Sequence, residues 1–248
     1  QINTNSTLGS SNFDGSIQSR AKVNATAGFS IVTYTGNGTG GATIGHGLGV
    51  APNWIIAKVR NASRSWAVGS DDSDWTLNLR LDENSGTANT SQSKNQWYET
   101  APTSTKFYVG DGDVGDYSGD TNVNGENYVA YCFSSVEGYS KFGKYTGNGS
   151  SNGRFVFTGF KVTWLLIKKT NTSESWILAD TKRNSNVGRE SPADSYLLAD
   201  QANAESTGII YDMLSNGFKF RSTSQNTSGH TYLYYAIGEA PFKNARAR

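Results

Sequence analysis

The residues in this chain that are best suited to chemistry are oxygen-bearing side chains crowded into one segment, residues 111–124. Carboxylate and amide oxygens can bind cations or hydrogen-bond to other polar groups, and a tyrosine ring adds an apolar face with a polar end. A β scaffold usually carries its binding residues on such a connecting segment. The candidate ligand-binding residues are Asp111, Asp113, Asp116, Tyr117, Asp120, Asn122 and Asn124.

The end of this segment partly matches a calcium-binding loop. Residues 120–125 read D-T-N-V-N-G and fit the opening D-x-N-x-N-G. The bidentate Glu that the pattern requires at position twelve is absent, because Tyr131 stands there. Three interpretations stay open, namely a calcium site, a recognition loop and a long polar loop held by Asx turns. The last is the simplest, so no metal and no cofactor is predicted.

Catalytic patterns are weak elsewhere in the sequence. The two histidines, His46 and His230, lie at non-equivalent positions without recognisable triad or metal partners, so structural hydrogen bonds are their expected role. The run 36–41 fits G-x-G-x-x-G, but no helical pattern follows it, which favours a hairpin turn. The single cysteine, Cys132, lies in an apolar run and is expected to be buried. We therefore expect a protein that is not an enzyme.

The composition of the 248 residues indicates a thin but aromatic core. Hydrophobic residues make up 35%, while Gly numbers 28 and Tyr, Phe and Trp number 13, 11 and 6. This mixture suits short strands and tight turns. The net charge of +1 predicts no attraction to nucleic acid, and no apolar run reaches the roughly 18 residues of a membrane span. Because the chain begins with Gln1 and its one methionine is Met213, we expect a processed product or part of a longer polypeptide.

The chain repeats itself, and self-similarity at a fixed period is a sign of repeated modules. Five blocks recur in one order, 104 to 111 residues later. The matched blocks are 34–38 with 145–149, 54–58 with 164–168, 65–66 with 175–176, 107–109 with 218–220, and 128–131 with 232–235. The spacing falls to 104 only at the last block, because the segment 110–127 is seven residues longer than the segment 221–231.

The matched blocks predict an all-β fold of two tandem, internally duplicated β-sandwich domains of the jelly-roll type. We expect the first domain to span residues 27–136 and the second to span residues 137–248. Residues 1–26 are polar and have few large apolar side chains, so we expect an N-terminal linker or arm. The apolar run 164–167 predicts a strand that is covered on both faces. Asn216-Gly217 predicts a tight hairpin turn.

Several segments of the sequence resemble one group of proteins. They read AGFSIVTYTG at 27–36, GHGLGVAP at 45–52, YVAYCFSSVEGYSKFG at 128–143 and YAIGEAPF at 235–242. All are similar to the repeated β-rich C-terminal modules of tail-fibre and other virion structural proteins of marine tailed phages, including cyanophages. The resemblance covers about residues 27–248, and its motifs are structural.

The resemblance implies a virion protein on an exposed appendage, which binds other virion proteins and forms a homotrimer. We expect it to contribute to receptor binding, with a host cell-surface glycan as the partner. A purely architectural capsid or tail component that packs against neighbouring subunits is the alternative. A carbohydrate-binding module of an enzyme, or a depolymerase, is a third interpretation. Neither nucleic-acid binding nor membrane insertion is expected.

Overall fold

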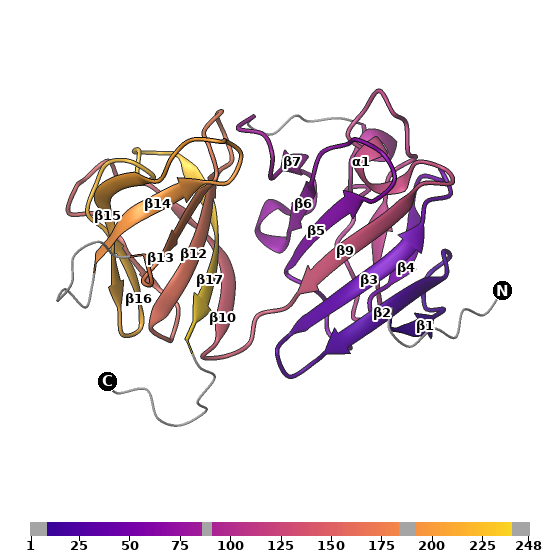
Figure 1. The fold of residues 1–248 in the computed structure, drawn as a ribbon, viewed down its shortest axis with the longest axis horizontal. Helices are drawn as coiled ribbons and strands as arrows, with labels where there is room; N and C mark the ends of the chain where they lie inside the picture. Colours follow the sequence, from indigo (N-terminus) through magenta and orange to yellow (C-terminus); the bar gives the residue numbers. More distant parts are fainter. Residues whose placement is uncertain (1–8, 86–90, 184–191, 240–248) are drawn as a thin grey trace. The chain divides into compact units, whose positions relative to one another are not determined.

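The computed structural model describes residues 9–85, 91–183 and 192–239, which form antiparallel β-sheets with very little helix (Figure 1). The all-β prediction is therefore confirmed. The described chain divides into two compact units. The first contains residues 9–81 and 91–134, and the second contains residues 82–85 and those from 135 onward. The division after residue 134 lies two residues before the predicted boundary.

The first unit is built on a seven-stranded antiparallel sheet in the order β1-β2-β3-β9-β5-β6-β7. Its strands are β1 (Ser10–Asn12), β2 (Ser19–Asn24), β3 (Phe29–Thr35), β5 (Trp54–Val59), β6 (Ala67–Ser70), β7 (Leu79–Arg80) and β9 (Asn127–Phe133). A separate pair of strands, β4 (Ala42–Gly45) and β8 (Lys106–Val109), shares a buried core with this sheet. Two short 3-10 helices, Asp71–Ser73 and Gln92–Lys94, lie between β6 and β8.

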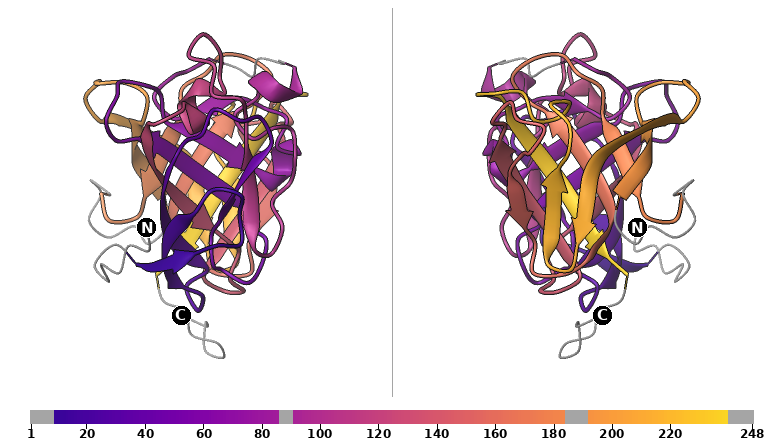
Figure 2. Two further views of the ribbon diagram at one scale, coloured as in Figure 1. Left: turned by 90° about the vertical axis from the view of Figure 1, so that its right-hand side faces the viewer. Right: turned by 90° about the vertical axis from the view of Figure 1, so that its left-hand side faces the viewer.

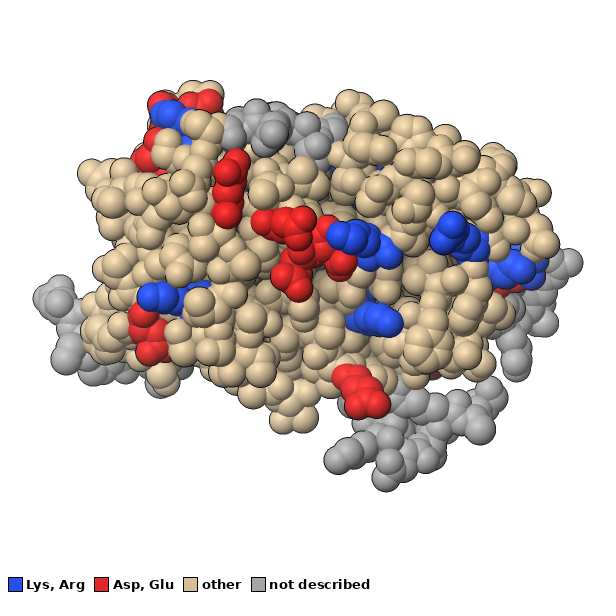
Figure 3. Space-filling view, turned by 180° about the vertical axis from the view of Figure 1, so that it is seen from behind, with Lys and Arg blue, Asp and Glu red and all other residues tan. Residues whose placement is uncertain are grey.

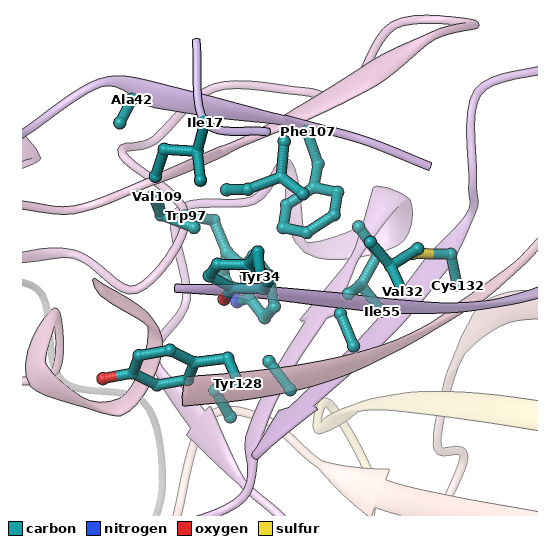
Figure 4. Close-up of a cluster of buried hydrophobic side chains, with 14 of the residues drawn as sticks. Ile17, Val32, Tyr34, Ala42, Ile55, Trp97, Phe107, Val109, Tyr128 and Cys132 are labelled. Atoms are coloured by element: carbon teal, nitrogen blue, oxygen red, sulfur yellow. The ribbon is translucent and has the colours of Figure 1, made fainter. Parts of the chain in front are cut away.

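Alternate side chains of the two sheets meet in one core (Figure 4). On β3, Val32 and Tyr34 are buried while their neighbours are partly exposed, as the two-residue period of a strand requires. Phe107 and Val109 on β8 contribute from the smaller sheet. Tyr34 stacks on Tyr128 of β9 with ring centroids 5.2 Å apart and meets Phe107 edge-on at 6.1 Å. These aromatic contacts join the two layers with few aliphatic residues.

The segment between β6 and β8 adds two buried rings to this core. Trp75 and Trp97 meet edge-on, with ring centroids 5.8 Å apart. Both pack against Gly69 of β6, where an added Cβ atom would lie within 2.7 Å of each ring, so only glycine leaves enough room. Cys132 of β9 is fully buried in the same cluster, as predicted. Burial raises the pKa of its thiol to about 12, which makes it an unreactive core residue.

Residues 10–12 and 19–24, within the segment that the sequence predicted to form an arm, are instead strands of the first sheet. β1 pairs with β2, and β2 pairs along its whole length with β3. Between β1 and β2, Ile17 is buried and forms a parallel bridge to Ile44 of β4. Pairing with neighbouring strands satisfies the backbone of a polar segment, so it needs few large apolar side chains of its own. The rest of the predicted arm, residues 1–8, lies outside the described residues.

The second unit contains one eight-stranded antiparallel sheet in the order β10-β17-β12-β13-β14-β15-β16-β11. Its strands are β10 (Ser140–Thr146), β11 (Phe155–Phe157), β12 (Val162–Lys169), β13 (Ile177–Asp180), β14 (Pro192–Leu198), β15 (Ser206–Leu214), β16 (Gly217–Phe220) and β17 (Thr231–Gly238). The sheet curls around a core (Figure 2, right) to which Tyr145 near one end and Phe218 near the other both contribute. The two end strands approach each other, since Lys141 Nζ on β10 donates a hydrogen bond of 3.0 Å to the Phe157 carbonyl on β11.

Two local predictions for the second unit can be compared directly with these strands. The apolar run 164–167 lies within β12, and Leu165 to Ile167 are buried. The predicted tight turn joins β15 to β16. Leu214 pairs with Gly217, so Ser215 and Asn216 are the turn residues, one position earlier than expected. The hairpin prediction is thus confirmed with a one-residue shift.

The two units share a strand-pairing scheme. β3-β9-β5-β6 in the first unit and β10-β17-β12-β13 in the second pair in the same order, and β4 pairs with β8 as β11 pairs with β16. The registers also match, because Tyr34 faces Tyr128 and Tyr145 faces Tyr232. The units differ beyond this frame. In the second unit β14 and β15 link β13 to β16, whereas no strand in the described part of the first unit links β7 to β8.

Replacing Ile17 with alanine is expected to lower the free energy of unfolding by about 2–4 kcal/mol, because the change leaves a cavity at a buried site. Urea unfolding monitored by tryptophan fluorescence measures the effect. The control is Val23→Ala on the same segment, where the side chain is 40% exposed and a change below about 0.5 kcal/mol is expected. Equal, small effects of the two substitutions would mean that residues 10–24 form an arm after all.

Candidate functional site

The candidate site is the long connection between β8 and β9 in the first unit. It consists of a loop followed by the single helical turn α1 (Gly119–Asn122), which is labelled in Figure 1. Because β8 and β9 belong to different sheets, the connection crosses from the smaller layer to the larger one. All seven predicted ligand-binding residues lie on it.

Three of the predicted carboxylates converge on one ammonium group. Lys94 Nζ lies 2.6 Å from Asp113 Oδ2, 3.4 Å from Asp111 Oδ2 and 3.5 Å from Asp116 Oδ2. Lys94 is the last residue of the 3-10 helix Gln92–Lys94, so a segment distant in the sequence supplies the cation. Its charge offsets the mutual repulsion of the three carboxylates and leaves the group with a net negative charge. We call Lys94 and these three aspartates the Lys94 cluster.

The Lys94 cluster shifts the ionisation of its own members. The hydrogen bond from Lys94 lowers the pKa of Asp113 below its usual value, and the same bond raises the pKa of Lys94. For Asp111, partial burial acts to raise the pKa, but hydrogen bonds from Ser118, the Asp113 N–H and Lys94 outweigh it and lower the pKa. Asp111, Asp113 and Lys94 therefore remain charged at neutral pH.

Short hydrogen bonds give the loop a defined backbone. Asp111 Oδ1 accepts from Ser118 Oγ at 2.8 Å and from the Asp113 N–H at 3.2 Å. Asp113 Oδ1 accepts from the Gly115 N–H at 2.9 Å. These are the Asx-type contacts that the simplest interpretation of the sequence predicted. They hold the loop in one shape before any ligand is present.

A second ion pair anchors the base of the loop. Asp120 is buried, and its Oδ2 accepts from Arg80 Nε at 2.7 Å and from Gln96 Nε2 at 3.0 Å. The guanidinium group of Arg80 also lies over the ring of Tyr117, 4.5 Å from its centroid. Arg80 thus fixes the position of Tyr117 while it neutralises Asp120. The prediction that Asp120 contacts a ligand is wrong, because its carboxylate is buried and bound within the protein.

Asn122 ties the long connection to the loop between β3 and β4. Its Oδ1 accepts from the Asn37 N–H at 3.0 Å, and its Nδ2 donates to the carbonyls of Thr39 at 3.0 Å and Gly110 at 2.7 Å. We call this set of bonds the asparagine clasp. Asn122 is fully buried, so its predicted role in ligand contact is also wrong. A buried amide with all these partners is structural.

The second unit contains the same clasp around Asn226. Its Oδ1 accepts from the Asn148 N–H at 3.1 Å, and its Nδ2 donates to the Ser150 carbonyl at 2.8 Å. In both units a core tyrosine also bonds the residue before the clasp: Tyr34 Oη donates to the Thr121 carbonyl and Tyr145 Oη to the Gln225 carbonyl, each at 2.7 Å. The seven-residue excess of the first unit therefore lies before Thr121, in the stretch that contains the three aspartates of the Lys94 cluster.

These contacts show what structure two of the sequence patterns form. Residues 120–125 do not form a calcium loop, because the Asp120 carboxylate binds Arg80 and the Asn122 side chain belongs to the clasp. Across the described ranges, no group of three or more His, Cys, Asp and Glu side chains is arranged to hold a metal ion. The glycine-rich run 36–41 joins β3 to β4, which lie in different sheets, so the predicted hairpin turn is wrong. It is a loop closed by the clasp.

Both histidines hold local structure, as predicted. His46 is buried, its Nδ1 accepts from the Leu48 N–H at 3.2 Å, and its Nε2 lies 3.1 Å from the Thr103 carbonyl. Burial lowers the pKa of His46, which keeps its ring neutral at pH 7. His230 Nδ1 lies 2.9 Å from Asn171 Oδ1. Each ring therefore has a local structural partner.

Five of the seven predicted residues keep side chains that solvent reaches: Asp111, Asp113, Asp116, Tyr117 and Asn124. Lys94 and Arg80 were not predicted, and they shape the site from segments that the repeated blocks do not cover. Val114, an exposed apolar side chain inside the loop, was not predicted either, although its place between Asp113 and Asp116 could have indicated it. No signal in the sequence linked Lys94 and Arg80 to the predicted set.

On the face shown in Figure 3, uncharged residues make up most of the surface, and the charged residues of both signs form small, scattered groups. That distribution agrees with the formal net charge of +1. Within the part of the chain that is described, no helix is long and apolar enough to span a bilayer.

Lys94→Ala is expected to raise the pKa of Asp113, because the substitution removes the bond that favours the carboxylate and leaves two like charges nearby. NMR titration of the side-chain carboxyl carbons measures this pKa. Since the pKa of folded Asp113 is lowered, its contribution to stability is present above the ordinary carboxyl pKa and is lost as pH falls through the lowered value. As the pH falls, the free energy of unfolding of the variant should therefore decrease less steeply than that of the unchanged protein.

The control for this titration is Lys22→Ala, which removes an exposed cation from β2 of the same unit. It should leave the pKa of Asp113 unchanged. A low pKa of Asp113 that persists in Lys94→Ala would contradict the assignment of Lys94 as its cause.

Asn122→Ala is expected to destabilise the protein by about 2–4 kcal/mol, because it leaves several buried backbone groups without their partner. Asn226→Ala should have a similar effect on the second unit. Chemical unfolding followed by circular dichroism measures both. Asn124→Ala, two residues along and exposed, is the matched control and should change stability by less than about 0.5 kcal/mol.

Comparison with known proteins places this architecture in a family. A family model described as a domain of unknown function (DUF7483) matches residues 3–241. The searches of curated proteins and of solved structures returned no match. The matched range includes β1 to β17 and therefore both units. The chain belongs to the DUF7483 family.

Proposed function

We propose that this chain is a non-enzymatic structural protein of a tailed-phage virion, and that its first unit helps to bind a polysaccharide receptor on the host surface. The observation that carries the proposal is the preorganised insertion before Thr121. It extends from a frame that the second unit shares, and the Lys94 cluster and Arg80 hold it in one shape. Loops of this kind on a rigid β scaffold are the usual place for binding.

The chemistry of the insertion suits a glycan. Sugar hydroxyls can donate to the accessible oxygens of Asp113 and Asp116, and the apolar face of a sugar ring can pack against Tyr117 and Val114. Because the loop is ordered in advance, little conformational entropy is lost on binding. A homotrimer would present three such loops, and several weak sites acting together give useful affinity.

The virion assignment rests on the resemblance of residues 27–248 to modules of phage appendage proteins. Two features support a role without catalysis. Asp111 and Asp113 have lowered pKa values, and His46 is buried and neutral, so these groups are poorly matched to acid–base chemistry near pH 7. The aspartates are instead suited to accept hydrogen bonds from a neutral ligand.

We also propose that the two units are copies of one sandwich-type module of the jelly-roll kind. The shared pairing order and the repeated asparagine clasp support this origin. Contacts outside the clasp repeat as well. Lys58 Nζ donates to the Arg64 carbonyl and lies 5.5 Å from the centre of the Trp66 ring. Lys168 Nζ donates to the Glu174 carbonyl, 5.6 Å from the centre of the Trp176 ring.

Tyr117→Ala and Asp116→Ala are each expected to reduce binding to host-surface polysaccharide about tenfold, equivalent to ~1.4 kcal/mol. Isothermal titration calorimetry with purified chain measures the affinity, and adsorption of particles carrying the variants measures the consequence. Thr223→Ala, in the shorter loop of the second unit, is the matched control. Thermal melting confirms that each variant is folded.

Three outcomes would contradict the proposal. Unchanged adsorption together with fragile particles would favour the purely architectural role. Release of oligosaccharide on incubation with capsule or lipopolysaccharide would show an enzyme. Equal losses in Thr223→Ala would place the binding surface outside the insertion.

A further inference from the structure

The outer edge of β11 in the second unit is an open strand edge with exposed aromatic side chains. β11 is the last strand of its sheet and pairs with β16. Among the described residues, no other strand pairs with it. Phe155 and Phe157 are 43% and 57% exposed, although both are large apolar residues. An edge of this kind is a template for the addition of a further strand.

The corresponding edge in the first unit is covered. β4 has the place in its unit that β11 has in the second, since Ile44 pairs with Phe107 as Val156 pairs with Phe218. The segment before β2 lies along β4, where the Ile17 N–H donates to the Thr43 carbonyl at 2.9 Å and Ser16 Oγ accepts from the Thr43 N–H at 2.9 Å. Ile17 and Ile44 form a parallel bridge. The protein therefore contains an example of what covers this edge.

Thr43 corresponds to Phe155 in this alignment, and no described segment runs along Phe155 as residues 16–17 run along Thr43. The carbonyl group of Phe157 on this edge has a hydrogen-bond partner of a different kind from its equivalent in the first unit. In the first unit, Ser19 Oγ donates to the Gly45 carbonyl at 2.7 Å. In the second, Lys141 Nζ donates to the equivalent Phe157 carbonyl at 3.0 Å and lies 5.5 Å from the centre of the Phe157 ring. A flexible lysine takes the place of a strand residue there, and it can be displaced.

The charges around β11 indicate the partner. Lys219 lies directly across from Phe155, and Lys141 contacts Phe157. Asp212, the carboxylate across from Lys219 on β15, forms an ion pair with Arg221. The surface beside the two phenylalanines is therefore cationic. The segment that covers β4 in the first unit carries Asp14.

We propose that the outer edge of β11 binds an extended, acidic peptide segment of a partner protein by strand addition. The peptide lies parallel to β11, as Ile17 lies along β4, and its backbone bonds to Phe155 and Phe157. Its apolar side chains pack on the two phenylalanine rings, and its acidic side chain lies near Lys219. Main-chain bonds supply affinity in this mode of recognition, and side-chain pockets supply specificity. Lys141 releases the Phe157 carbonyl when the peptide binds.

The test uses the full chain and a synthetic peptide with the sequence of residues 10–18, SSNFDGSIQ, as the probe. NMR amide exchange should show slower exchange at Phe155 and Phe157 when the peptide is added. Lys141→Ala should bind a peptide with Asp14 replaced by Asn about fivefold more tightly than the unchanged chain does, because a competing hydrogen bond is removed and the lost positive charge matters little for this probe. A peptide with Asp14 replaced by Lys should bind about tenfold more weakly, since the edge is cationic.

Phe155→Pro should abolish binding, because proline removes an outward N–H without removing a bond to β16. Phe155→Asp serves as a second variant that repels the acidic probe if the proline variant does not fold. Val50→Ser, which removes an exposed apolar side chain from the first unit, is the control and should bind normally.

Any of four results would overturn the proposal. Binding without amide protection at β11 would place the peptide elsewhere, and unchanged affinity in Lys141→Ala would remove the displacement step. Acidic polysaccharide that protects β11 where the peptide does not would make the edge a sugar site. Self-association of the chain that Phe155→Pro abolishes would make a second copy the occupant.

Discussion

A buried side-chain amide must find partners for its oxygen and its nitrogen, because each buried polar group left unsatisfied costs about 1–3 kcal/mol. Asn122 and Asn226 meet this requirement by bonding to the loop that leaves β3 or β10. The Asn122 clasp therefore holds the connection that crosses from the smaller sheet to the larger one in the first unit, and the Asn226 clasp holds the connection between β16 and β17 within the single sheet of the second unit. The stacked tyrosines beneath each clasp, such as Tyr34 and Tyr128, then pack in register.

The two units differ in how the edges of their sheets are covered. In the first, the polar segment 10–24 covers the edges of β3 and β4 with backbone bonds, so a segment without a core of its own becomes ordered. In the second, Lys141 spans the gap between β10 and β11 with one side chain. A lysine at an edge discourages uncontrolled pairing while leaving the backbone accessible to a chosen partner. The same strand-pairing scheme therefore occurs once with its edge covered by a segment of the chain and once with its edge bridged by a single side chain.

The acidic loop illustrates how a group of like charges becomes a rigid surface. Three aspartates within reach of one another would repel, but the Lys94 ammonium lies within 3.5 Å of all three. The hydrogen bond from Lys94 lowers the pKa of Asp113, and hydrogen bonds from Ser118, the Asp113 N–H and Lys94 together lower the pKa of Asp111. The loop gains a fixed shape and a stable charge together. Both properties support the proposed recognition of a neutral, hydroxyl-rich ligand.

The sequence by itself determined the β content, the burial of Cys132 and the hairpin after residue 214, because these depend on alternation and turn chemistry within a few residues. Four of its five repeated blocks also lie on strands that pair alike in the two units. Only the tertiary structure decided that residues 10–24 belong to a sheet and that Asp120 and Asn122 are buried. It also brought Lys94 and Arg80 to the loop. Those outcomes depend on hydrogen bonds and ion pairs between segments far apart in the chain, and local patterns in a sequence carry no record of which distant segment will supply the partner.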